Sequence, residues 1–151
     1  MEISVFRDNE LITGISILAV LRFTKKLELS KCMLIEPLLS YSKVLKLLKR
    51  ANSSVKSIED LIIKESIIFS NFSSRYQEKL ILSINSLLLF KEMGLLQIED
   101  NIVIYDGNSF DFSEQSLGER TRNRISASRK LAEILTKGDA SDFYLSLRIE
   151  L

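Results

Sequence analysis

An almost unbroken apolar run over residues 9–23 is the strongest constraint on the fold. A helix that lies on a surface shows polar residues every three or four positions. Here almost every position is apolar, so the segment predicts a helix covered on most sides by other elements, with Asp8 or Asn9 capping its start. Between Leu11 and Leu21 the interruptions of the run are Thr13, Gly14 and Ser16.

The same run raises the question of a secretory or membrane segment. Leu11–Leu21 is long enough for the core of a signal peptide, but Asp8 and Glu10 flank it and Arg22 follows where small residues are expected. No stretch reaches the roughly 18 consecutive apolar residues that a membrane-spanning helix needs. The lone cysteine, Cys32, cannot form an intramolecular disulfide. We therefore expect a core helix in a cytoplasmic protein that does not contact a membrane.

Several shorter segments follow this run. The block over residues 30–39 contains the only proline, Pro37, which predicts that a helix bends or ends near Glu36. Residues 43–50 carry apolar residues between basic ones, and the polar stretch over 52–56 is the best candidate for a loop. Ser57 followed by Asp60 resembles a capping box that opens a short helix through residue 63.

The longest periodic segment predicts a helix from Phe72 to Met93, which Gly94 ends. Its predicted core stripe consists of Tyr76, Leu80, Ile84, Leu87 and Leu88. A hairpin is expected next, with strands over 95–99 and 102–105, because Asp100 and Asn101 tolerate the positive φ of a tight turn. Two further helices are expected over 120–137 and 140–148.

The sequence thus predicts a mainly α fold with a small β-hairpin. We expect a single domain over residues 1–151, with a helical N-terminal part over about 1–70, a winged-helix-like helix and hairpin over about 72–105, and C-terminal helices over about 119–150. Hydrophobic residues make up 46% and charged residues 27% of the chain, which suits a globular protein.

Signatures of catalysis are missing from the sequence. With no histidine there is no Ser-His or Cys-His pair and no histidine metal cluster, and there is no glycine-rich phosphate loop. The neighbouring acids Glu59 and Asp60 are interpreted as first-turn residues that complement the helix dipole. Cys32 lies in an apolar block and is expected to be a buried thiol. We predict no catalytic, cofactor-binding or metal-ligating residue.

Two apolar clusters outside the predicted core stripe are candidate partner contacts. On the helix over 72–93 an otherwise polar arc is interrupted, which indicates that two surfaces cover this helix. The candidate partner-binding residues are Leu82, Leu89, Phe90 and Met93 there, with Phe143 and Tyr144 in the last helix. These faces favour a winged helix that packs against protein over one that reads DNA.

A basic patch lies over residues 120–130, although the net charge of the chain is only +1. Positive charge is unfavourable at a helix N-terminus, and such a local violation hints at function. The patch is either an ordinary solvated face or a contact with DNA phosphates or an acidic partner. Its members are Arg120, Arg122, Arg124, Arg129 and Lys130.

The order of these segments resembles a known family. The resemblance rests on the apolar block leading into Pro37-Leu38-Leu39, the helix starts at 57–61 and 72–76, the helix over 80–94 with its Gly-Leu-Leu end, and the terminal segment 143–149. In these features the chain is similar to the middle component of bacterial three-component ABC-ATPase systems, the group that includes Lamassu-type antiphage defence.

This resemblance implies a small non-catalytic subunit that binds an SMC- or Rad50-like ATPase and helps to hold an effector, commonly a nuclease-type subunit. It supplies no catalytic residues. The alternative hypothesis is a winged-helix DNA-binding regulator, whose affinity for DNA would fall steeply with added salt. An enzyme that acts through carboxylates alone has the least support.

Overall fold

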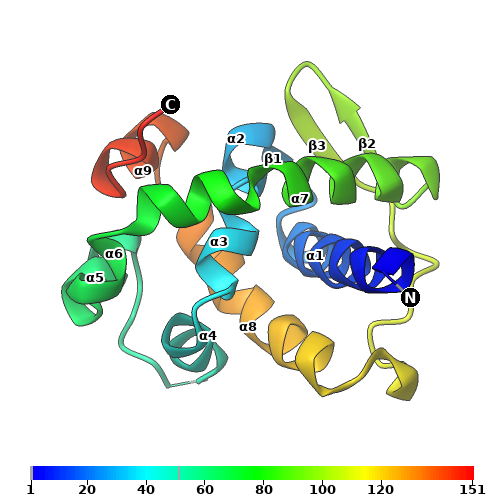
Figure 1. Ribbon diagram of the computed structural model, residues 1–151, viewed down its shortest axis with the longest axis horizontal. Coiled ribbons are helices and arrows are strands. Elements are labelled where there is room, and N and C mark those ends of the chain that lie inside the picture. The colour runs from blue at the N-terminus through cyan, green and yellow to red at the C-terminus, as the bar shows by residue number, and fades with distance from the viewer. Residues whose placement is uncertain (1, 51) are drawn as a thin grey trace.

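The protein is mainly helical, with one small antiparallel sheet (Figure 1). The computed structural model describes the backbone of residues 2–50 and 52–151 and the side chains of residues 9–50 and 52–151. Its helices are α1 (Glu2–Thr24), α2 (Leu29–Cys32), α3 (Ile35–Leu39), α4 (Ser42–Lys49), α5 (Ile58–Lys64), α6 (Ser66–Phe69), α7 (Phe72–Glu92), α8 (Glu119–Leu135) and α9 (Ala140–Ser146), with a 3₁₀ turn, η1 (Gln115–Leu117). Its strands are β1 (Lys26–Glu28), β2 (Leu96–Glu99) and β3 (Ile102–Tyr105).

Helix α1 lies at the centre of the fold. Every residue from Thr13 to Leu21 is buried, and α1 packs most extensively against α8 and α7 (Figure 1). The prediction of a helix covered on most sides is confirmed. The predicted start is wrong, because α1 begins at Glu2 and places Asp8 and Asn9 inside the helix.

Pro37 breaks the helix one turn earlier than predicted. The interruption lies between α2 and α3, at Met33 and Leu34, and Pro37 itself stands in the first turn of α3. The reason is that the missing amide hydrogen of Pro37 removes the bond to the carbonyl four residues before it, that of Met33. In the first turn of α3 a proline does not destabilise the helix, because a backbone amide at this position would have no hydrogen-bond acceptor within the helix.

Two predicted helix boundaries are confirmed by their hydrogen bonds. The hydroxyl of Ser57 accepts the amide of Asp60 at 3.1 Å, and the carboxylate of Asp60 accepts the amide of Lys56 at 2.9 Å, so α5 has a variant of the capping box. At the end of α7 the amide of Leu95 donates to the carbonyl of Phe90 and that of Gly94 to Lys91, with Gly94 at φ +76°. This is a Schellman ending.

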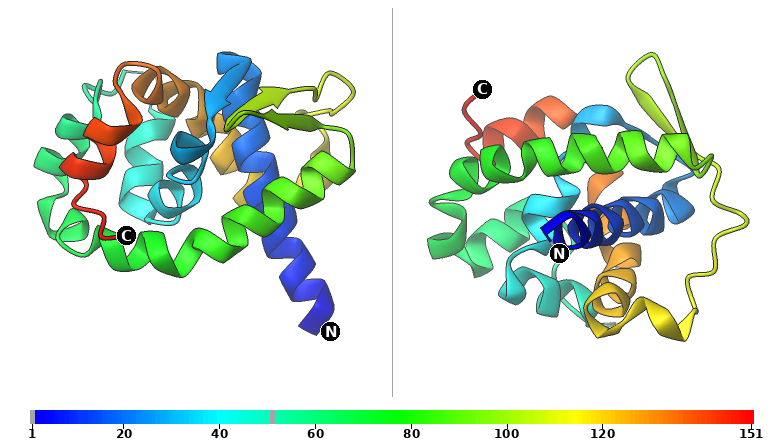
Figure 2. Two further views of the ribbon diagram at one scale, coloured as in Figure 1. Left: turned by 90° about the horizontal axis from the view of Figure 1, so that it is seen from above. Right: turned by 45° about the vertical axis from the view of Figure 1, so that its right-hand side comes forward.

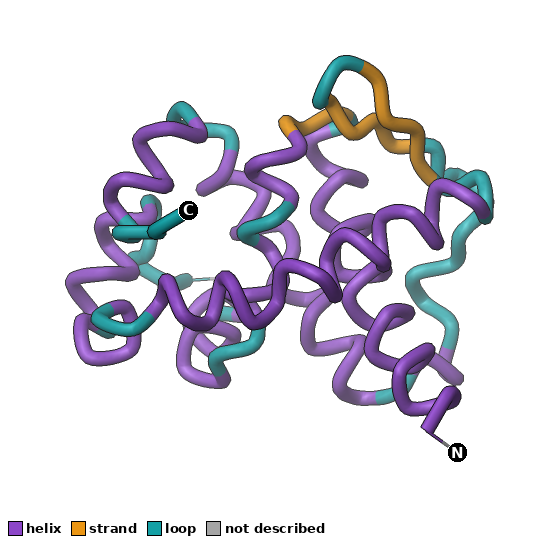
Figure 3. The backbone as a smooth tube through the Cα atoms, turned by 45° about the horizontal axis from the view of Figure 1, so that its top comes forward, coloured by secondary structure: helices purple, strands orange, loops and turns teal. Residues whose placement is uncertain are grey.

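The hairpin is confirmed, and a third strand joins it. Asp100 and Asn101 have φ values of 50° and 64°, as a tight turn of type I′ requires. Strand β1, which the sequence pattern does not predict, pairs with β3 and puts Leu27 opposite Val103. The sheet order is β1-β3-β2 (Figures 1 and 3). The central strand β3 carries Val103, which is fully buried.

Cys32 is completely buried, as predicted. Burial in an apolar environment raises the pKa of its thiol, and the negative charge of Glu28 raises that pKa further. Because the thiolate is the reactive form, we expect the native protein at pH 8 to remain unlabelled by a disulfide-exchange reagent such as Ellman's reagent. One thiol per chain should appear on denaturation. Rapid labelling under native conditions would contradict the buried placement.

Candidate functional site

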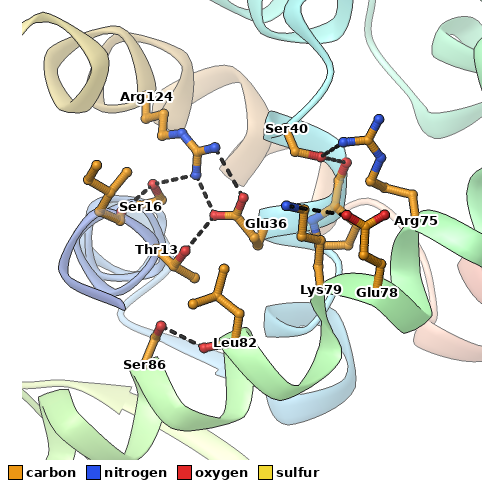
Figure 4. Close-up of polar contacts among 12 residues, drawn as sticks. Thr13, Ser16, Glu36, Ser40, Arg75, Glu78, Lys79, Leu82, Ser86 and Arg124 are labelled. Atoms are coloured by element: carbon orange, nitrogen blue, oxygen red, sulfur yellow. Dashed lines mark hydrogen bonds and ion pairs between the residues drawn. The ribbon is translucent and has the colours of Figure 1, made fainter. Parts of the chain in front are cut away.

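A buried ion pair joins three helices at the centre of the molecule. Arg124 of α8 holds both carboxylate oxygens of Glu36 of α3 (Figure 4), and the second of these bonds measures 3.1 Å. On α1, Thr13 donates its hydroxyl to Glu36 at 2.7 Å, and Ser16 accepts a longer bond from Arg124. All four residues are at most 4% exposed. A buried charge needs such complete pairing, and the cluster is therefore part of the fold.

This placement corrects the prediction for Arg124: its guanidinium is paired with Glu36 inside the fold and is not part of an exposed basic face. It was grouped with its neighbours by sequence, but on α8 it faces α1 and α3. Arg122 and Arg129 are exposed, and Arg129 lies over the ring of Phe23 at 4.7 Å. Lys130 is half-buried and lies 3.8 Å from the carboxylate of Glu133.

The predicted partner face of α7 is also partly wrong. Phe90 is 1% exposed and packs against α1, where it lies over Gly14. Leu82 and Leu89 are half-buried, and of the four predicted residues only Met93 is exposed. The apolar side chains that α7 does expose include Ile84 and Leu88, which were assigned to the core.

The error has a local physical cause. Ser83 and Ser86 are fully buried on the inner face of α7, which also carries Phe72, Tyr76 and Leu87. A hydrophobic pattern assigns serines to the solvent-facing side of a helix. The predicted apolar stripe was therefore placed on a different face of α7 from the one that is buried. Ser86 satisfies its hydroxyl by donating to the carbonyl of Leu82 at 2.7 Å, which makes its burial inexpensive.

An apolar groove of about 950 Å³ opens between the hairpin and the C-terminal segment. We call it the apolar groove. Helix α2 lies between α9 and the hairpin when the molecule is viewed from above (Figure 2). The groove is lined by Glu28, Leu29, Ser30, Met33, Tyr76, Asp100, Asn101, Ile102, Ala140, Ser141, Tyr144, Leu145, Ile149 and Leu151.

Tyr144 fixes one wall of the apolar groove. Its hydroxyl donates to the carbonyl of Ser30 at 2.7 Å and shares a 3.0 Å hydrogen bond with the hydroxyl of Tyr76. Burial and the hydrogen bond with Tyr76 raise the pKa of Tyr144, so its hydroxyl stays neutral. The C-terminal segment is also fixed, because the amide of Glu150 donates to the hydroxyl of Ser73 at 2.9 Å. The wall is thus preformed.

Of the two residues predicted in the last helix, Tyr144 lines the apolar groove and Phe143 does not. Phe143 is 5% exposed and packs in the core, so its prediction as a partner contact is wrong. Its neighbour Leu145, which was not predicted, is 76% exposed on the groove. No sequence signal marks the groove, because its lining comes from four separate segments.

Neither a metal site nor a membrane-spanning helix occurs in the part of the chain that the structure describes. Among the side chains of residues 9–50 and 52–151, no cluster of three or more His, Cys, Asp or Glu residues could hold a metal ion. Among the described helices, none combines the length and apolar character needed to cross a membrane. Comparison with protein-family models, curated proteins and solved structures yields no match.

Proposed function

We propose that this chain is a non-catalytic accessory subunit that binds a helix of a partner protein in the apolar groove. The observation that carries the proposal is the preformed groove of about 950 Å³ with apolar walls. Exposed apolar surface of this kind marks an interaction site, and a groove between helices suits an amphipathic helix.

The charges of the apolar groove define the partner helix further. The charged side chains of its lining are Glu28 and Asp100, both acids. Glu28 is paired with Lys31 at 3.4 Å, whereas Asp100 stands at the hairpin tip. A partner helix that presents an apolar stripe with a lysine or arginine beside it would complement this lining.

The resemblance to the middle component of three-component ABC-ATPase systems gives the proposed partner its identity. In that setting the chain bridges an SMC- or Rad50-like ATPase and an effector subunit in antiphage defence. We propose that α7 and the β2–β3 hairpin form the winged-helix-like element of this subunit and act through protein contacts. Support for protein contacts comes from the exposed face of α7. This face carries Ile81, Ile84 and Leu88 and few basic side chains.

The proposal is tested by changing one exposed residue of the apolar groove. Leu145→Glu places an acid beside an acidic lining, and the 76% exposure of Leu145 means that folding tolerates the change. The matched control is Ile67→Glu on α6, where Ile67 is 88% exposed and outside the groove. Tagged versions are expressed in the native host, and co-purified proteins are quantified by mass spectrometry.

We expect the wild-type chain and the Ile67→Glu control to recover a long coiled-coil ATPase with a third subunit. Leu145→Glu should recover at least about tenfold less of the ATPase, since burying an unpaired charge at an interface costs more than about 1.4 kcal/mol. If both variants recovered the ATPase as well as the wild type does, the apolar groove would not be the site that binds the ATPase. Recovery of no such ATPase by the wild type would remove the ABC-ATPase assignment.

A further inference from the structure

A second, smaller pocket collects positive charge where α3, α4, α7 and α8 meet. It measures about 220 Å³ and is lined by Arg75, Lys79, Arg120 and Arg124, with Ser40 and Ser42 beside them. We call it the cationic pocket. It is separate from the apolar groove, and the two share no lining residue.

Most of the positive charge in the cationic pocket is uncompensated. The one acid in its lining is Glu36, whose carboxylate is already held by Arg124 and Thr13. Lys79 lies 3.9 Å from Glu78, but that carboxylate is 66% exposed, and an exposed ion pair of this kind contributes little. Arg75 and Arg120 add two further charges. Such convergence of like charge is unfavourable unless a counter-ion fills the space.

Two contacts hold the guanidinium group of Arg75 in place. Its guanidinium carbon lies 4.3 Å from the ring centroid of Tyr41, and one nitrogen donates to the hydroxyl of Ser40 at 3.3 Å (Figure 4). A guanidinium has five N–H donors, so this single bond leaves others for an anion. Because the guanidinium of Arg75 is already stacked on the ring of Tyr41, its side chain would lose less conformational entropy when an anion binds.

The N-terminus of α4 adds to this field. Ser42, the first residue of α4, lines the cationic pocket, and the preceding Tyr41 supplies no side-chain oxygen to cap the helix. The first turn of α4 contains no acid. The first amides of a helix point outward without partners within the helix, and they favour negative charge.

We propose that the cationic pocket binds a phosphate-bearing anion. Arginine forks and a helix N-terminus match phosphate oxygens in geometry and in charge. At about 220 Å³ the pocket is smaller than the roughly 300–1,000 Å³ of ordinary small-molecule sites. It therefore suits one or two phosphate groups, either free or at the end of a larger molecule, and not an entire nucleotide. This site does not depend on the proposed partner helix.

The test uses inorganic pyrophosphate as the probe, titrated into the full chain by calorimetry at about physiological salt. The variant is Lys79→Gln with Arg120→Gln, which removes two charges from the cationic pocket and keeps the Arg124–Glu36 pair. The matched control is Lys64→Gln with Lys91→Gln, two exposed lysines outside the pocket. Thermal unfolding without ligand checks that both double variants remain folded.

We expect the Lys79→Gln, Arg120→Gln variant to bind pyrophosphate at least about tenfold more weakly, because it loses two cationic donors of charge-assisted hydrogen bonds to the phosphate oxygens. The control should stay within about twofold of the wild type, because distant charges are screened at this salt. Equal weakening in both variants, or no binding by the wild type, would overturn the proposal. A 5′-phosphorylated dinucleotide that binds more tightly than its 5′-hydroxyl counterpart would identify a terminal phosphate as the source; equal binding of the two would identify free phosphate or pyrophosphate.

Discussion

Arg124→Met is expected to destabilise the protein by about 3–5 kcal/mol, the cost of leaving a buried charge without its partner. Glu36 is 3% exposed, and after the substitution its carboxylate would keep only the hydrogen bond from Thr13. Methionine preserves much of the length and apolar volume of the arginine side chain. The measurement is urea denaturation followed by circular dichroism.

Two further variants separate the lost charge pair from other effects. Arg122→Met on the same helix changes an exposed arginine and should shift stability by no more than about 0.5 kcal/mol. Combining Arg124→Met with Glu36→Leu removes both charges and should recover most of the loss, because an apolar pair of similar volume often replaces a buried ion pair at little cost. If Arg124→Met proved as mild as Arg122→Met, the buried pair would not contribute as described.

Gly14→Ala is expected to destabilise the protein by about 3 kcal/mol, the upper part of the range for overpacking a core. Helix propensity alone predicts the opposite sign, since alanine is favoured over glycine within a helix by about 1 kcal/mol. The sign reverses because an added Cβ would lie 2.6 Å from Cζ of Phe90, and both residues are buried at the crossing of α1 and α7. Denaturation of the single variant measures the effect.

A second variant, Phe90→Ala, tests whether the effect of Gly14→Ala arises from the contact with Phe90. Alone it should cost about 3–5 kcal/mol through the cavity that it leaves. Together the two changes should cost clearly less than the sum of the separate losses, because the alanine at position 14 then occupies space vacated by the ring. Simple additivity would show that the contact between Gly14 and Phe90 does not limit the approach of α1 and α7.

Much of the fold follows from local chemistry that a sequence shows directly. The Schellman ending at Gly94 and the turn at Asp100 and Asn101 depend on residues within a few positions of each other. Their backbone requirements are met by few residue types, so the pattern determines the structure. The mainly α fold with a small hairpin was predicted on this basis, and it is confirmed.

Features built from distant residues were not predictable in the same way. Arg124 and Glu36 are separated by 88 positions, and no local sequence pattern indicates that these two side chains form an ion pair. Strand β1 has three residues, too few for an alternating pattern to stand out, and it forms because β3 offers an edge. The cationic pocket likewise draws Arg75 and Arg120 from different helices.

The central position of α1 has a consequence for biosynthesis. The nine buried residues Thr13–Leu21 obtain their cover chiefly from α7 and α8, which follow much later in the chain. At about 5–20 residues per second, the roughly 95 residues from the end of α1 to the start of α8 take on the order of 5–20 s to translate. Until both α7 and α8 have been translated, the emerging α1 segment keeps apolar surface exposed outside the ribosome. The nascent chain is therefore expected to depend on a holding chaperone until α8 has emerged.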